Sequence, residues 1–272
     1  MKGCGLDCVW CHNPESKSAR VETFYDSNKC IGCGACVKVC KNNAHTIRDE
    51  HVYNRQNCKG CLACGAVCPC GALENCGEEK TVREVLDIVL RDRVFYKESL
   101  GGITLSGGEP LLQYDFSLAL LKEAKRQGLH TAIETSGFTN RWLDDISEYV
   151  DLWLYDIKIL DSIRHKKYVG VDNDMILKNL RKLDGMGANI ILRCPIIPDI
   201  NDNEEHFSAL CDLANSLENV KEINLQLYHP LGISKAERLG KESKYNNKEF
   251  LKKEEIGYLI DILKKGTKVP VL

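Results

Sequence analysis

Cysteine spacing is the feature that most constrains this chain. All but two of its 15 cysteines lie before residue 77, and most of these fall into three tight runs. In a small secreted protein such a density predicts disulfides, but this chain has 272 residues and no apolar signal-peptide core at its N-terminus. Closely spaced cysteines in a large protein without an export signal favour metal ligation instead.

Two of the runs, at residues 30–40 and 58–68, share the spacing C-x2-C-x2-C-x3-C, and Pro69 follows the second. Small residues between the thiols allow the backbone to curl around a cubane. In two-cluster arrangements the fourth cysteine of each run ligates the other cluster. The spacing therefore predicts one [4Fe–4S] cluster on Cys30, Cys33, Cys36 and Cys68, and another on Cys58, Cys61, Cys64 and Cys40. Two zinc sites are the alternative, although zinc ligands more often pair two C-x2-C units across a longer loop.

The run at the N-terminus differs in kind, because Cys4, Cys8 and Cys11 have the spacing C-x3-C-x2-C with no fourth cysteine. Three thiolates leave one coordination position of a cubane open, and an open position is typical of a catalytic metal. Two alternatives remain: a fourth ligand from Cys70 or Cys76, or zinc. The last two cysteines, Cys194 and Cys211, lie in a predicted strand and a predicted helix, where we expect buried core residues.

Helical and strand patterns alternate from about residue 81 onward. Apolar periodicity and stop signals predict helices at 81–99, 114–128, 141–150, 174–187, 203–218 and 252–266. Strands are predicted between them at 101–110, 130–137, 151–160, 188–198 and 222–230, with a short last strand at 268–272. Repeated β-then-α units predict an α/β fold with a parallel sheet, whose functional loops follow the carboxyl ends of the strands. The segments SGGEP, ETSG, DIK, RCPIIPDIND and YHPLG all end or follow such strands.

Composition excludes several classes of partner. The formal net charge of −2 gives no reason to expect nucleic acid or an anionic membrane as a partner. No apolar run approaches the ~18 residues that span a bilayer. We therefore expect a cytoplasmic protein.

The opening stretch KGCGLDCVWCHNPES resembles the cluster loop of radical S-adenosylmethionine (SAM) enzymes, and more narrowly that of the activating enzymes of glycyl-radical enzymes. Further similar motifs follow in the same order: FYKESLGGITLSGGEPLLQ, ETSGF, DIK, HKKYVGVDN, RCPIIPDIND and YHPLGISKAERLG. The resemblance extends from end to end. The two four-cysteine runs match the subgroup that inserts a two-cluster module after the catalytic loop.

The resemblance implies a partial (β/α)6-type radical SAM barrel with a small ferredoxin-like insert. The resemblance divides the chain into a cluster loop at 1–22, the insert at 23–77, and the remainder of the barrel at 78–272. Family members carry about one more strand ahead of the cluster loop. We therefore expect the first barrel strand to be absent from this chain, through a misplaced start or because the chain is a fragment.

The resemblance also assigns site residues. Cys4, Cys8 and Cys11 hold the SAM-binding cluster, and Trp10, Cys11 and His12 line SAM beside it. Gly107 and Gly108 allow close backbone approach, and Glu109 orients the ammonium group. Further SAM contacts are expected from Asp156, Ile157, Lys158, Arg193 and His229, with a monovalent cation near Asp156 and Glu134. A core salt bridge for Arg193 and a purely structural role for His229 are the alternatives.

The activity that the resemblance implies is reductive cleavage of SAM. The resulting 5′-deoxyadenosyl radical removes hydrogen from a glycine of a partner glycyl-radical enzyme. The expected cofactors are three [4Fe–4S] clusters and SAM, with flavodoxin or ferredoxin as electron donor and a monomeric enzyme. Two alternatives remain: a ferredoxin-like electron-transfer protein, or a radical SAM enzyme that acts on a small molecule.

Overall fold

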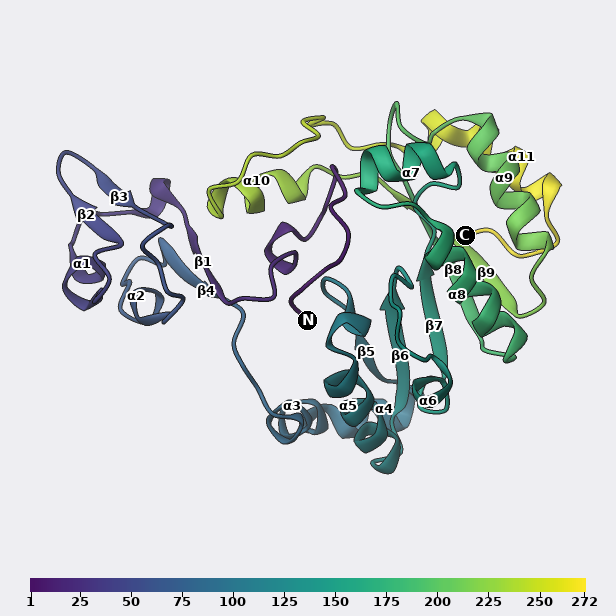
Figure 1. The fold of residues 1–272 in the computed structure, drawn as a ribbon, viewed down its shortest axis with the longest axis horizontal. Coiled ribbons are helices and arrows are strands. Elements are labelled where there is room, and N and C mark those ends of the chain that lie inside the picture. The colour runs from purple at the N-terminus through teal and green to yellow at the C-terminus, as the bar shows by residue number, and fades with distance from the viewer.

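A five-stranded parallel sheet organises the larger part of the molecule and, with the helices that cross over between its strands, forms a partial barrel. The computed structural model describes all residues, 1–272. The strands follow chain order across the sheet (Figure 1). They are β5 (Gly102–Leu105), β6 (His130–Thr135), β7 (Leu152–Asp156), β8 (Ile190–Ile196) and β9 (Val220–Leu227). Because every neighbouring pair is parallel, all five carboxyl ends lie at one edge.

Helices cross over between these strands, as parallel pairing requires. The crossover and flanking helices are α3 (Val82–Val89), α4 (Arg93–Ser99), α5 (Tyr114–Arg126), α6 (Asp144–Ser147), α7 (Ser162–Val169), α8 (Asp174–Gly185), α9 (Glu204–Asn215), α10 (Leu231–Arg238) and α11 (Gly257–Gly266). The apolar faces of these helices, except α7 and α10, share one large core with the sheet, in which Trp153, Tyr155 and Phe207 are fully buried. This core fixes the strand ends that carry the polar residues described below.

The cysteine-rich segment forms a separate lobe, coloured purple to blue in Figure 1. Strands β1 (Glu22–Tyr25) and β4 (Leu73–Cys76) pair antiparallel where the lobe leaves and rejoins the barrel. Between them lie α1 (Ala35–Val39), the hairpin of β2 (His45–Ile47) and β3 (His51–Tyr53), and α2 (Ala63–Ala66). Helix α10 packs against β1, between the lobe and the barrel.

A second, smaller core attaches the N-terminal loop to the barrel. It contains Leu6, Cys8 and Trp10 from the loop together with Ile159, Val169, Ile197, Ile200 and Tyr228. Backbone bonds reinforce this packing, because Asp7 N donates to Val169 O at 2.8 Å and Val9 N donates to Tyr168 O at 3.0 Å. The loop is thereby held against α7 at the carboxyl edge of the sheet.

The predicted order of elements is confirmed, with differences in extent. The predicted helix at 81–99 divides into α3 and α4 around a short 3-10 turn, and the one at 141–150 is reduced to α6. The expected last strand forms only a single bridge, from Val271 to Ile223. Helices α7 and α10 were not predicted. None of the helices has the length and apolar character that a membrane span needs.

Candidate active site

A cavity of about 350 Å³ lies between the N-terminal loop and the carboxyl edge of the sheet. It gathers residues that are far apart in sequence. From the predicted set, it is lined by Cys4, Cys8, Trp10, Cys11, His12, Gly107, Gly108, Glu134, Asp156, Lys158, Arg193 and His229. The three closely spaced thiols and the polar strand ends therefore share one space.

Four charged side chains form a connected group on this cavity. Lys158 Nζ lies 3.0 Å from Asp156 Oδ2, and Arg193 Nε lies 3.9 Å from Asp156 Oδ1. The Arg193 guanidinium also pairs with Glu134, whose other oxygen accepts a hydrogen bond from Ser106 at 2.9 Å. Two cations thus face two carboxylates, and the guanidinium contacts both acids.

Burial and neighbouring charges set the protonation of the Lys158 amine. Burial alone opposes its charge, but Asp156 and the thiolate forms of Cys8 and Cys4 outweigh that cost and raise the pKa of Lys158 above its usual value. The same burial raises the pKa of the Cys8 thiol to about 12. Metal binding would have to displace that proton, because a thiolate and not a thiol ligates metal.

After β5 the backbone of residues 107 and 108 lies so close to the N-terminal loop that both residues must be glycine. Gly107 has φ of +124°, and a Cβ there would lie 2.1 Å from the Met1 nitrogen. A Cβ on Gly108 would lie 2.2 Å from Gly3 O. Only residues without a side chain allow the N-terminal loop to pack here while both positions line the cavity.

Two predicted site residues do not line the cavity. Glu109 is buried, and its carboxylate accepts hydrogen bonds from Leu111 N (3.1 Å), Thr135 Oγ1 (2.6 Å), Ser136 N (2.9 Å) and Ser136 Oγ (2.6 Å). These donors tie the turn after β5 to the turn after β6. Ile157 belongs to the main hydrophobic core. Direct contact of either side chain with SAM stays a prediction.

Two stacked histidines, His12 and His229, also line the active-site cavity. The rings of His12 and His229 stack with centroids 4.0 Å apart, and both His12 Nε2 and His229 Nδ1 are buried without a hydrogen-bond partner. Burial, then the neighbouring His229, lowers the pKa of His12 to about 4, so its ring is neutral near pH 7. Unpartnered buried polar atoms in a cavity of this size indicate a polar ligand.

Sequence reasoning missed several residues of this cavity. Gln226 near the end of β9 and Lys235 of α10 both line it. Lys235 Nζ lies 2.8 Å from Glu15 Oε1 and 2.9 Å from Asn13 Oδ1, so it fastens α10 to the segment after Cys11. The available signal for Gln226 was its position at a strand end, and that for Lys235 was its place in the motif YHPLGISKAERLG.

The lobe contains two further cysteine-lined cavities. One is lined by Cys30, Cys33, Cys36 and Cys68, and also by Cys70 and His51. The other is lined by Cys40, Cys58, Cys61 and Cys64, and also by His45. Backbone amides point at the thiols in both: Leu73 N donates to Cys68 Sγ, and Ala44 N donates to Cys40 Sγ, each at 3.4 Å.

These donor sets fit iron–sulfur clusters. Each lobe cavity offers the four thiols of a cubane, and amide-to-sulfur hydrogen bonds are the usual support for such sites. The active-site cavity offers three thiols, a balanced charge group and unpartnered imidazole nitrogens, which suit a three-ligand cluster beside a zwitterionic ligand. Neither Cys70 nor Cys76 lines the active-site cavity.

Comparisons with known proteins agree with this geometry. The model of the radical SAM superfamily matches residues 1–211. The choline trimethylamine-lyase activating enzyme of Oleidesulfovibrio alaskensis is 40% identical over 250 residues, which cover 89% of this chain and 81% of that protein. The trans-4-hydroxy-L-proline dehydratase activating enzyme of Clostridioides difficile is 39% identical over an alignment of 282 positions, which covers 99% of this chain and 91% of that one.

A solved structure shows the same architecture. A domain of the pyruvate-formate lyase-activating enzyme from Bacteroides vulgatus superposes with a TM-score of 0.53 at 27% identity. The superposition covers 63% of this chain and 98% of that domain.

Proposed function

The chain belongs to the radical SAM superfamily and, within it, to the activating enzymes of glycyl-radical enzymes, and from this premise we propose that it cleaves SAM to remove hydrogen from a glycine of a partner enzyme. The observation that carries the proposal is the single cavity that joins three closely spaced thiols to the charged strand ends. An electron-transfer protein has no use for that second group of residues.

Cys4, Cys8 and Cys11 would hold the catalytic [4Fe–4S] cluster, which when bound supplies the electron that splits SAM. The chain's own residues position the substrate. Arg193 and Lys158 are the cations available to the SAM carboxylate, and Asp156 and Glu134 are the acids available to its ammonium group. Because these four side chains already pair with one another, they are ordered before SAM binds. Binding then costs less conformational entropy.

We infer that His12 and His229 bind the adenosine part of SAM. Their stacked rings present a flat surface, and His12 Nε2 and His229 Nδ1 each lack a partner. The His12 ring also lies near Tyr228, with ring centroids 5.8 Å apart, and Leu231 lines the same cavity.

The lobe spanning residues 23–77 would hold two further [4Fe–4S] clusters with the ligand sets of its two cavities. We further propose a monomeric enzyme, with flavodoxin or ferredoxin as the external donor. A monovalent cation near Glu134 also stays a proposal, and Arg193 already contacts both carboxylates there. The identity of the partner is left open, because relatives named for choline, isethionate and hydroxyproline enzymes are 39–43% identical to this chain.

The test is an anaerobic assay of reconstituted protein with SAM and dithionite. The proposal expects 5′-deoxyadenosine to form, and a glycine-centred doublet to appear by electron paramagnetic resonance (EPR) when a cognate glycyl-radical enzyme is added. A protein that binds clusters yet leaves SAM intact would favour an electron-transfer role. 5′-Deoxyadenosine formed without any doublet across the glycyl-radical enzymes encoded beside it would favour a small-molecule substrate.

A further inference from the structure

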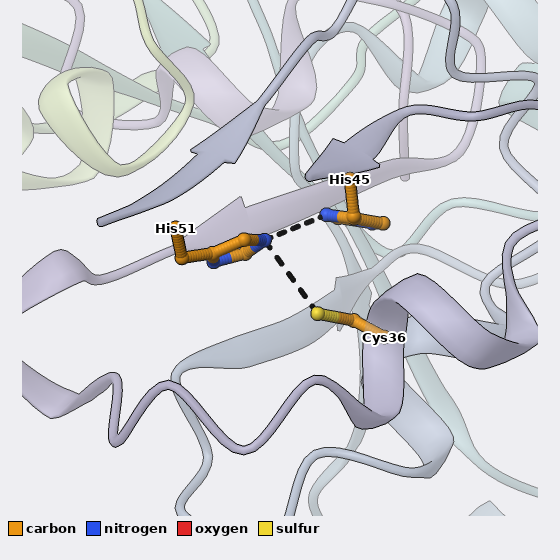
Figure 2. Close-up of side chains that lie close together, drawn as sticks. All are labelled: Cys36, His45 and His51. Carbon is orange, nitrogen blue, oxygen red and sulfur yellow. Dashed lines mark hydrogen bonds between the residues drawn. The ribbon is translucent and has the colours of Figure 1, made fainter. Parts of the chain in front are cut away.

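Two histidines lie side by side between the two cavities of the lobe (Figure 2). His45 Nδ1 and His51 Nε2 are 3.0 Å apart. His51 Nε2 is also 3.5 Å from Cys36 Sγ, and His51 Nδ1 is 3.7 Å from Cys30 Sγ. His51 lines the cavity of these two cysteines, and His45 lines the other cavity.

The β2–β3 hairpin explains this placement. His45 pairs with Tyr53 and Ile47 pairs with His51, and alternation along each strand brings all four side chains to one face. Aromatic packing then fixes the rings, because Tyr53 stacks on His45 at 4.5 Å and Tyr25 meets the His51 ring edge-on at 4.7 Å. The imidazoles are therefore held in position and are not free surface groups.

Either neutral tautomer of His51 directs an N–H at a cysteine of the same cavity. If Nδ1 carries the proton, it points at Cys30 Sγ, and Nε2 accepts from His45 Nδ1–H. If Nε2 carries the proton, it is shared between Cys36 Sγ and His45 Nδ1. His45, by contrast, makes no hydrogen bond to a thiol of its own cavity.

We propose that His51 is a positioning residue that donates a hydrogen bond to a thiolate ligand of the cluster on Cys30, Cys33, Cys36 and Cys68, and that His45 holds the His51 ring for this bond. The inference rests on the proposed ligation of that cluster. A hydrogen bond to a cluster sulfur stabilises the reduced, more negative state more than the oxidised state. The His51 bond therefore raises the reduction potential of this cluster relative to its neighbour, although the two cysteine runs have the same spacing.

The experiment is an EPR-monitored redox titration of the full reconstituted chain, with iron counted per chain. His51→Ala should keep the iron content and make one cluster harder to reduce. At a fixed potential the ratio of reduced to oxidised cluster should fall about tenfold. This corresponds to a reduction potential lower by about 59 mV for a one-electron couple. His45→Ala should shift the same cluster in the same direction by less. His130→Ala, an exposed histidine at the start of β6, is the matched control and should change nothing.

Two donor-preserving variants separate a hydrogen bond from mere packing. The amide of His51→Asn places its N–H near the position of Nδ1, and that of His51→Gln places it near the position of Nε2. One of the two should restore the wild-type potential, and which one does so identifies the tautomer. If neither titrates closer to the wild type than His51→Ala, the hydrogen-bond role is overturned.

Other results also overturn the inference. These are a His51→Ala protein that titrates like the wild type, loss of about four irons in all three His51 variants, and stoichiometric zinc on Cys36, His45 and His51, whose ligand atoms lie within 4.8 Å of one another. Wild-type protein with only about four irons would refute the lobe clusters and this inference together. Absence of activase activity with the potential shift intact would refute the proposed function alone.

Discussion

Arg193 and Asp156 are register partners on adjacent parallel strands, and their side chains meet at the active-site cavity with Arg193 Nε 3.9 Å from Asp156 Oδ1. The same guanidinium pairs with Glu134 on the next strand, β6. Three neighbouring strands therefore deliver one connected charge group, because parallel strands end at the same edge of the sheet. The group is balanced in charge, and SAM carries both an acid and an amine that match it.

Replacing Arg193 should weaken SAM binding without removing iron. Arg193→Met leaves Glu134 and Asp156 without the guanidinium they share, so we expect the SAM dissociation constant to rise about tenfold or more, or about 1.4 kcal/mol. Arg193→Lys should recover part of this loss, since it keeps the charge but not the fork. Calorimetry on reconstituted protein measures both variants, with the exposed Arg126→Met as control. If Arg193→Met binds SAM as tightly as the wild type, Arg193 only forms a core salt bridge and does not contact SAM.

Cysteine variants should show which thiols ligate the clusters. Cys8→Ser should lower the iron content by about four per chain and abolish 5′-deoxyadenosine formation, because it removes one of three ligands from the catalytic set. Cys70→Ser should keep all iron, although Cys70 Sγ lies 3.8 Å from Cys68 Sγ. The buried Cys211→Ser serves as control. Loss of a cluster in Cys70→Ser would mean that Cys70, and not Cys68, completes its ligand set.

Glu109 should matter first for stability. Its carboxylate accepts four hydrogen bonds, two of them from the backbone amides of Leu111 and Ser136. Glu109→Gln turns an amide donor toward at least one of these donors, so the free energy of unfolding should fall by about 2 kcal/mol. Urea denaturation measures this fall, and the exposed Glu98→Gln should have no effect. Intact stability combined with lost SAM affinity would instead support the predicted contact with the ammonium group.

The sequence was sufficient for the features that depend on spacing and periodicity. The eight thiols of the two lobe runs line two cavities in the predicted groups of four, and their ligation of clusters stays a prediction. The alternation of β5 to β9 with crossover helices was equally readable. The strand–helix alternation is a local pattern that periodicity reveals. Each group of four thiols instead joins two runs, which only the folding of the lobe brings together.

Features that depend on packing were not readable. Helix α7 has a polar, lysine-rich sequence, and part of what fixes it is the backbone pairing of Tyr168 and Val169 with the N-terminal loop. Glu109 looks like a ligand-facing acid because it follows two glycines at a strand end. After the turn at Gly107, with φ of +124°, its carboxylate accepts hydrogen bonds from Thr135 and Ser136, and its contact with the SAM ammonium group stays a prediction. Such a turn is set by the loop that packs on it, which the sequence does not specify.

Arg55 should control how the lobe sits against the barrel. Its guanidinium lies over the Tyr53 ring at 4.5 Å and donates to Thr23 O at 2.8 Å and, across the boundary, to Arg238 O at 2.6 Å. Arg55→Ala removes both bonds, so amides at 231–241 should exchange with deuterium faster while those of β6 to β8 do not change. Hydrogen-exchange mass spectrometry measures this, with the exposed Arg48→Ala of the same lobe as control. Equal exchange in both variants would show that other contacts, such as Arg238 with Glu74, suffice.

His206 should make the protein less stable in mild acid. Burial, then the charge of Arg164, lowers the pKa of His206 to about 4, and its Nε2 has no partner. The folded state therefore keeps the ring neutral, while the unfolded chain takes up a proton below its ordinary pKa of about 6.5. Stability from this group is full above about pH 6.5 and is lost as the pH falls toward 4, by about 2 kcal/mol between pH 7 and pH 5.

Urea midpoints at both pH values should show a smaller acid-dependent loss of stability in His206→Gln than in the wild type, and the exposed His130→Gln should match the wild type. If His206→Gln loses as much stability in acid as the wild type, the buried ring is not the group that titrates.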